Sequence, residues 1–441
     1  MTLKTKWLAT AAGFGFVAAG AVAANAASHA QTVTIATVNN GDMVRMQKLT
    51  DDFTEKNPDI NLEWVTLEEN VLRQRVTQDI ASKGGQFDVM TIGTYEVPIW
   101  AAQGWLKPLE NIDDPDDILP SIKAGLSYED QLYAAPFYGE SSMVMYRTDL
   151  FEEAGLEMPE APTWEQVADF ARQLTDKDAE QYGICLRGKA GWGENMAFIT
   201  TVANSFGARW FDEEWNAQFD QPAWKEAVDF YVNLLNEAGP PGASSNGFNE
   251  NLALFQQGKC AMWIDATVAA SFVTNPNDST VADKVGFALA PDTGKGKRSN
   301  WLWAWSLAIP EGTDAPEAAE KFVSWATSKA YAELVAEQEG WANVPPGTRT
   351  SLYENEEYLQ AASFAEMTKK SMDMADPTNP TVDPVPYTGV QFVAIPEFQA
   401  IGTAVGEQMS AALAGNQSVD EALQAAQDLT TREMQRAGYP K

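Results

Sequence analysis

The sequence predicts an α/β protein built from two units that each combine a sheet with covering helices. Strands and helices alternate as βαβαβ between residues 32 and 92, the pattern of a parallel sheet with helices on both faces. The same alternation restarts after Pro162, which indicates a second unit. The chain has 441 residues, enough for two or three units of ordinary domain size with apolar cores.

Hydrophobic spacing predicts the elements of the first unit. Residues 32–35 alternate like a strand, an amphipathic helix runs up to Asn57-Pro58, and residues 60–67 read as extended. A second helix over 71–82 leads into a strand over 88–92. Because ligands of open parallel sheets lie beyond the carboxyl ends of the strands, we expect a ligand beside the residues that follow the first and third strands.

Capping residues mark later helix starts. Thr163 with Gln166 predicts a capping box, and Ser418 with Glu421 predicts another. Pro316 in a first turn predicts a further helix. The strands expected in this part of the chain cover residues 182–186, 258–265 and 285–290.

The first residues read as an export signal. Lys4 and Lys6 precede a small and apolar run, and Ala24-Asn25-Ala26 has the small-x-small pattern of a signal peptidase site, so residues 1–26 are expected to be a signal peptide. A membrane anchor is the alternative, but the run is rich in Ala and Gly. No cysteine near the cleavage site offers itself to a lipid, so we expect the mature chain in the periplasm, without direct membrane insertion.

Composition excludes several classes of function. Asp and Glu outnumber Lys and Arg by 62 to 30, so the field of the chain repels nucleic acid. The only histidine, His29, precedes the predicted fold, which excludes Ser-His-Asp and Cys-His catalysis and argues against a zinc site. No dinucleotide fingerprint follows the first strand, so we expect no nucleotide cofactor. Taken together, these observations lead us to expect a protein that is not an enzyme and that holds no metal and no cofactor. Cys185 and Cys260 either form a disulfide or remain buried thiols.

Tryptophan offers a positive signal. Trp301, Trp303 and Trp305 alternate along one predicted strand and therefore point to one face. Such a face is either part of a core or a wall against which the C–H groups of a sugar or polyol pack. Two other functions stay open: a secreted glycoside hydrolase with paired carboxylates, and an osmolyte-binding protein whose tryptophan cage holds a quaternary ammonium ion.

Several blocks of sequence carry a family resemblance. They are APFYGESSMVMYR (135–147), GKCAMW (258–263), SLAIP (306–310) and GNQSVDEAL (415–423). Together they span nearly the whole mature chain in one order, and they resemble the extracellular solute-binding proteins, family 1, that feed ABC importers. Within that family the resemblance is to periplasmic sorbitol- and mannitol-binding proteins.

The resemblance implies the two-lobed periplasmic-binding-protein fold, similar to maltose-binding protein, with the ligand cleft between the lobes. Carried over, the first lobe takes residues 31–141 plus 286–328, and the second takes 145–282 plus 332–441. It implies a monomer that captures a polyol or sugar by closure of the lobes and delivers it to an inner-membrane ABC permease.

The resemblance also implies a set of ligand contacts in the cleft. They are Asn40, Asp42, Thr94, Tyr95, Glu140, Arg187, Trp192, Asp265, Trp303, Trp305 and Arg349. Each has a structural alternative: Asp42 and Thr94 can cap helices, and Glu140 and Arg187 can belong to ion pairs that only hold the fold.

Overall fold

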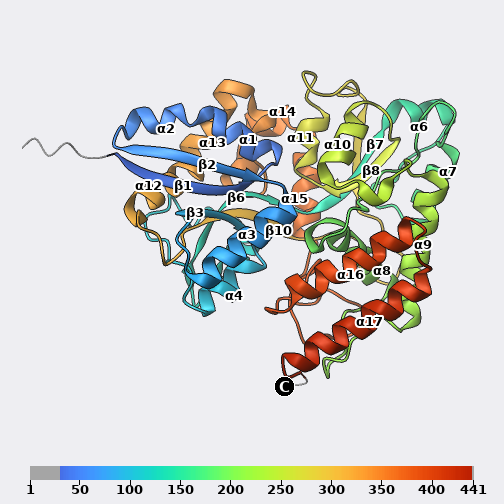
Figure 1. Cartoon of the computed structure of the whole chain (residues 1–441). Coiled ribbons are helices and arrows are strands. Elements are labelled where there is room, and N and C mark those ends of the chain that lie inside the picture. Colours follow the sequence, from blue (N-terminus) through green and yellow to red (C-terminus); the bar gives the residue numbers. More distant parts are fainter. Residues whose placement is uncertain (1–29, 440–441) are drawn as a thin grey trace, which may run out of the picture.

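The computed structural model describes residues 30–439, so the predicted signal peptide and His29 lie outside the described residues. The chain forms two lobes, which we define by their sheets (Figure 1). The first lobe is built on a five-stranded sheet and the second on a three-stranded sheet. Within the described range, no helix is long and apolar enough to cross a membrane.

The sheet of the first lobe is mixed. Its strands, in spatial order, are β2 (Ile60–Leu67), β1 (Gln31–Val38), β3 (Val89–Gly93), β10 (Trp303–Ala308) and β6 (Ala134–Glu140). The predicted βαβαβ unit is confirmed, because β1 pairs parallel with both β2 and β3. The late strand β10 runs antiparallel between β3 and β6. This insertion places the strand that carries Trp303 and Trp305 inside the sheet of the first lobe.

Helices cover both faces of this sheet. They are α1 (Gly41–Leu49), α2 (Asp51–Lys56), α3 (Glu69–Ser82), α4 (Glu96–Ala102), α5 (Pro120–Gly125), α12 (Pro316–Ala326) and α13 (Lys329–Glu339). On one face, Phe53 of α2 meets Phe322 of α12 edge-on with ring centroids 5.6 Å apart. Figure 1 shows α3 and α4 on the other face. A small hairpin, β4 (Ser127–Tyr128) and β5 (Gln131–Leu132), leads into β6.

The second lobe has an antiparallel sheet of order β8 (Met262–Ala266), β7 (Ser142–Arg147) and β9 (Val285–Leu289). Its helices are α6 (Thr148–Ala154), α7 (Trp164–Gln173), α8 (Ala197–Phe206), α9 (Pro222–Ala238), α10 (Phe248–Gln256), α11 (Ala269–Val273), α15 (Ala365–Asp373), α16 (Phe398–Leu413) and α17 (Val419–Arg436). Both predicted capping boxes are present, before α7 and before α17. The strand predicted over 182–186 is wrong, since this segment forms only isolated bridges at Tyr182 and Cys185.

The chain passes between the lobes three times. It first crosses from β6 to β7 through Ser141, and it returns from β9 to β10. The third passage includes α14 (Glu356–Ala361) and ends at α15, which packs on β7 and β9. The predicted lobe starts at 286 and 332 are therefore too early. The reason is that β9 pairs with β7, and that Gly139 of β6 still donates to the Pro346 carbonyl at 2.9 Å.

The two cysteines form a disulfide, which decides between the two alternatives left by the sequence. The Cα atoms of Cys185 and Cys260 are 5.9 Å apart, and both residues are buried. The bond ties the segment around Cys185 to the start of β8. Two residues further on, Arg187 therefore lies against that strand.

Candidate functional site

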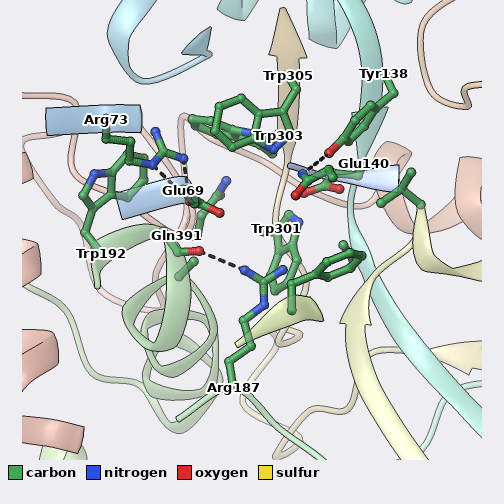
Figure 2. A pocket seen from close by; sticks show the side chains of 16 residues that line it. Glu69, Arg73, Tyr138, Glu140, Arg187, Trp192, Trp301, Trp303, Trp305 and Gln391 are labelled. Carbon is green, nitrogen blue, oxygen red and sulfur yellow. Dashed lines mark hydrogen bonds and ion pairs between the residues drawn. The ribbon is translucent and has the colours of Figure 1, made fainter. Parts of the chain in front are cut away.

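A cavity lies between the two lobes, where the ends of β1 and β6 and the start of β10 face the second lobe (Figure 2). The empty space between the lining residues, including the part that is open to solvent, is about 460 Å³. The lining residues are Asn40, Glu69, Arg73, Tyr138, Glu140, Arg187, Trp192, Gly193, Ala197, Phe248, Ala266, Val268, Trp301, Trp303, Trp305 and Gln391. Both lobes contribute, so an occupant would contact the two of them at once.

Tryptophan rings form one wall of the cavity. Trp303 pairs with Glu140 and Trp305 with Tyr138 across the β10 and β6 strands, so these four side chains share one face of the sheet. The Trp303 and Trp305 rings meet edge-on with centroids 5.5 Å apart. The ring centroid of Trp192, in the second lobe, lies 5.7 Å from that of Trp303. The shared face predicted for three rings is confirmed for Trp303 and Trp305, and it is a cavity wall as well as part of the core. Trp301 also lines the cavity, but it precedes β10, which begins at Trp303.

Arg187 faces this wall from the second lobe (Figure 2). Asp265 holds it there. Its Nη2 lies 2.6 Å from Asp265 Oδ1 and its Nε 3.0 Å from Oδ2, while its Nη1 donates to the Gly193 carbonyl at 2.9 Å. The Trp263 indole N–H also donates to Asp265. Burial lowers the pKa of Arg187, yet the Asp265 carboxylate outweighs it and holds that pKa above its ordinary value. Asp265 itself does not line the cavity; in the structure it fixes Arg187.

A second arginine, Arg73 of α3, reaches across the cleft. Its Nε lies 3.0 Å from Glu69 Oε1, and its Nη1 lies 2.5 Å from Glu96 Oε1. The guanidinium carbon lies 4.0 Å from the ring centroid of Trp192 in the second lobe and 4.7 Å from that of Trp305. It also lies 5.1 Å from the ring centroid of Trp303, so this cation over three indoles fixes the aromatic wall from the first lobe.

Glu140 lies at the first crossing between the lobes and faces the cavity. Burial raises the pKa of its carboxyl to about 8; Arg187 opposes the rise, while Asp265 and Glu69 add to it. Below pH 8 the group is therefore a neutral carboxylic acid, which can both donate a hydrogen bond and accept one. A hydroxyl-rich ligand needs both kinds of partner.

Among residues 30–439, no group of three or more His, Cys, Asp or Glu is placed to hold a metal ion.

An amide and a phenol extend the polar side of the cavity. Asn40, directly after β1, donates from Nδ2 to the Tyr138 hydroxyl at 2.6 Å. Gln391 is fixed in the same way, since its Nε2 donates to the Leu302 carbonyl at 2.9 Å. These fixed dipoles present oriented hydrogen-bonding atoms to the cavity.

The structure brings six of the predicted site residues to the cavity: Asn40, Glu140, Arg187, Trp192, Trp303 and Trp305. Among the others, Asp42 forms an ion pair with Arg45 on α1, and burial raises the pKa of Asp42 to about 6, against the attraction of Arg45. Arg349 points to the carbonyls of Asp113 and Thr327, at 2.7 and 2.8 Å. Neither Asp42 nor Arg349 lines the cavity, because each is held by partners of its own lobe.

Thr94 and Tyr95, after β3, also lie outside the cavity lining. Thr94 is buried beside Gly125 of α5. The Tyr95 hydroxyl donates to the Ile395 carbonyl at 2.9 Å and accepts from the backbone N–H of Gln399 at 3.1 Å, both in the second lobe. Tyr95 thus joins the lobes instead of lining the space between them.

Other contacts across the cleft come from α3 and the loop before it. Lys189 Nζ lies 2.5 Å from Glu68 Oε1, and Asn70 Nδ2 donates to the Ala190 carbonyl at 3.1 Å. With the Tyr95 bonds, they hold the lobes in a closed arrangement.

Five charged, polar or aromatic residues of the lining were not predicted from the sequence: Glu69, Arg73, Tyr138, Phe248 and Gln391. Tyr138 had a usable signal, because it stands two residues before Glu140 on one strand and so shares its face. Glu69 and Arg73 form an i,i+4 pair, which on sequence alone is indistinguishable from an exposed ion pair of a helix.

Comparison with known proteins shows which family this chain resembles. The profile of the bacterial extracellular solute-binding protein family matches residues 38–333. The mannitol-binding protein of Pseudomonas aeruginosa is 60% identical over 418 residues, 94% of this chain and 96% of that protein. The crystal structure of an ABC transporter solute binding protein from Agrobacterium vitis S4 with bound D-mannitol has a TM-score of 0.93 at 70% identity, covering 93% of this chain and all of that one.

A more distant structure has the same two-lobed architecture. The ABC transporter solute binding protein from Agrobacterium radiobacter K84, in complex with ribitol, has a TM-score of 0.80 at 25% identity and covers 91% of this chain and 98% of that one. The predicted two-lobed periplasmic-binding-protein fold is therefore confirmed. Because the family profile covers well over half of the sequence and a curated relative is 60% identical along nearly all of it, this chain belongs to the bacterial extracellular solute-binding protein family.

Proposed function

We propose that this chain is the periplasmic substrate-binding component of an ABC importer and that it captures a polyol, D-mannitol or sorbitol, in the cavity between its lobes. The observation that carries the proposal is that the cavity combines an indole wall with hydrogen-bonding groups, of which Glu140 and Asn40 lie beside the indoles and Arg187 lies opposite them. The C–H faces of an extended polyol pack on Trp303 and Trp305, while Glu140, Arg187 and Asn40 bind its hydroxyls. The relatives named for mannitol support the choice of ligand.

Capture proceeds by closure of the lobes. A ligand that contacts Trp303 of the first lobe and Arg187 of the second stabilises the closed arrangement more than an open one, which shifts the population towards it. The closed shape is what the inner-membrane permease recognises, and the polyol is released to it unchanged. The protein acts as a monomer and without catalysis, and the predicted signal peptide delivers it to the periplasm.

A thermal-shift screen of the mature protein tests the choice of ligand. A ligand that binds only the folded state raises the melting temperature. We expect the largest rise with D-mannitol or sorbitol, a smaller one with ribitol, and none with maltose or choline. A dominant response to choline would support an osmolyte-binding protein instead, and no response to any hexitol would contradict the proposal.

A second arm separates binding from hydrolysis. We expect that D-mannitol recovered after prolonged incubation is chemically unchanged, and that oligosaccharides release no reducing sugar. Catalytic release of reducing sugar would support the glycoside hydrolase alternative.

A further inference from the structure

The Trp303 indole packs directly against the backbone of Gly93. Gly93 ends β3, and in the neighbouring strand β10 its direct partner is Trp305, two residues from Trp303. A Cβ atom built on Gly93 would lie 1.9 Å from Cζ2 of the Trp303 ring and 2.2 Å from Cη2. The indole therefore occupies the very space that any other residue at position 93 would fill.

Two rings of the second lobe also contact the Trp303 indole. Trp192 meets Trp303 edge-on at 5.7 Å, and Phe392 lies 6.0 Å away, both in the second lobe. Trp303 as a whole residue is only 4% exposed. The Gly93 backbone and the contacts with these two rings hold the indole in place, so the ring cannot recede into the sheet.

A wall in a fixed position limits the space in front of it. Arg187 and Phe248 bound the other side of the cavity, and Arg187 is held by Asp265. Neither boundary has room to yield, because protein interiors are packed densely and repacking them is costly. A longer ligand therefore meets the Trp303 ring before the lobes can close.

We propose that the Gly93–Trp303 contact sets the upper size limit of the ligand, admitting one six-carbon chain or one sugar ring and rejecting a second ring. This inference rests on the proposed capture of a polyol. It makes Gly93 a specificity-determining residue although Gly93 has no side chain to touch a ligand.

Calorimetric titration of D-mannitol and of maltitol, a hexitol with a glucose unit attached, tests the proposal. We expect the native chain to bind mannitol and to show no maltitol binding. Trp303→Ala should lose at least about tenfold in mannitol affinity and gain measurable binding of maltitol. The control Trp105→Ala removes an indole of the same lobe that does not line the cavity, and it should keep the native preference.

Gly93→Ala tests the contact between Gly93 and the Trp303 ring itself. In the native background it should weaken mannitol binding at least about tenfold, because the new methyl group displaces the indole. In the Trp303→Ala background the same change should alter maltitol affinity less than about twofold, because the clash has gone. Gly312→Ala serves as the matched control, since a Cβ there meets nothing within 4 Å. If Gly93→Ala alone does not fold, recovery of the native circular dichroism spectrum in the double variant supports the same contact.

The outcomes separate this inference from the function on which it rests. A native chain that binds no hexitol contradicts the proposed function. A native chain that binds mannitol, together with a Trp303→Ala variant that still rejects maltitol, overturns only the size limit. Equal losses from Gly93→Ala in both backgrounds also overturn it.

Discussion

Asp265 and Arg187 form a buried two-point ion pair whose shortest distance, from Nη2 to Oδ1, is 2.6 Å. Asp265 also accepts from the Trp263 indole N–H at 3.1 Å and from the backbone N–H of Ala266 at 2.7 Å. The carboxylate is thus fully used by the protein. It fixes the guanidinium that faces the cavity.

Removing the carboxylate should destabilise the whole chain. Asp265→Ala leaves the buried Arg187 charge without its partner, which we expect to lower the free energy of unfolding by about 3–5 kcal/mol. Urea unfolding measures this loss, and Asp265→Asn, which keeps one oxygen acceptor, should lose less. A variant with native stability but weak mannitol binding would show instead that Asp265 contacts the ligand.

Glu140 should make stability depend on pH. In the unfolded chain its carboxyl ionises near 4.5, whereas in the folded chain burial, opposed by Arg187, raises the pKa to about 8. Between these values the unfolded chain has released the proton and the folded chain keeps it, so the contribution of Glu140 to stability falls as pH rises from 4.5 to 8.

Glu140→Gln removes this dependence. We expect the variant to gain stability relative to the native chain across that window, by up to roughly 1.4 kcal/mol for each pH unit, with no gain below pH 4.5. Thermal unfolding at fixed pH values measures the difference, and the exposed Glu153→Gln is the control. A difference between variant and native chain that stays constant from pH 5 to pH 8 would refute the raised pKa.

The disulfide should stabilise both the second lobe and the site. Cys185 and Cys260 are separated by 75 residues, and replacing both by Ala should cost about 2–4 kcal/mol of unfolding free energy. Because Arg187 follows Cys185 by two residues, mannitol affinity should fall as well. Denaturant unfolding and calorimetry measure the two effects, and unchanged values in both would mean that the bond is dispensable.

Tyr95→Phe should favour the open arrangement. The hydroxyl donates to the Ile395 carbonyl and accepts from the Gln399 N–H, both in the second lobe. In an open state, water can form hydrogen bonds with both groups instead. Losing these bonds should lower the apparent mannitol affinity about fivefold to tenfold.

Small-angle scattering without ligand should then give a larger radius of gyration for Tyr95→Phe than for the native chain. The matched control is Tyr353→Phe, whose hydroxyl accepts from the Gly347 N–H within the first lobe. That variant should lose stability without opening. Identical scattering and affinity in Tyr95→Phe and the native chain would remove Tyr95 from the closing contact.

The strands and caps of the fold were predictable because their signals are local. β2 and both capping boxes are set by alternation and by residues three positions apart. The return of β10 to the first sheet and the pairing of β9 with β7 depend on contacts between distant segments. For that reason the lobe boundaries at 286 and 332 were misplaced.

The site divides in the same way. The positions of Trp303, Trp305 and Glu140 at the cavity were predictable because strand alternation and a crossover position define where their side chains point. Asp42 lies outside the cavity lining, and Arg45, three residues further along the helix, binds its carboxylate. Arg73 was missed because its role arises only when Trp192 of the other lobe lies under it, which no local pattern records.

Isothermal titration of D-mannitol into the mature protein tests the central claim most directly, namely that a polyol is captured between the two lobes. We expect one saturable site per chain in the native protein and at least about tenfold weaker binding in Arg187→Ala, because the opposing polar wall is then lost. Absence of saturable binding to the native chain, or binding that Arg187→Ala leaves unchanged, would contradict the account.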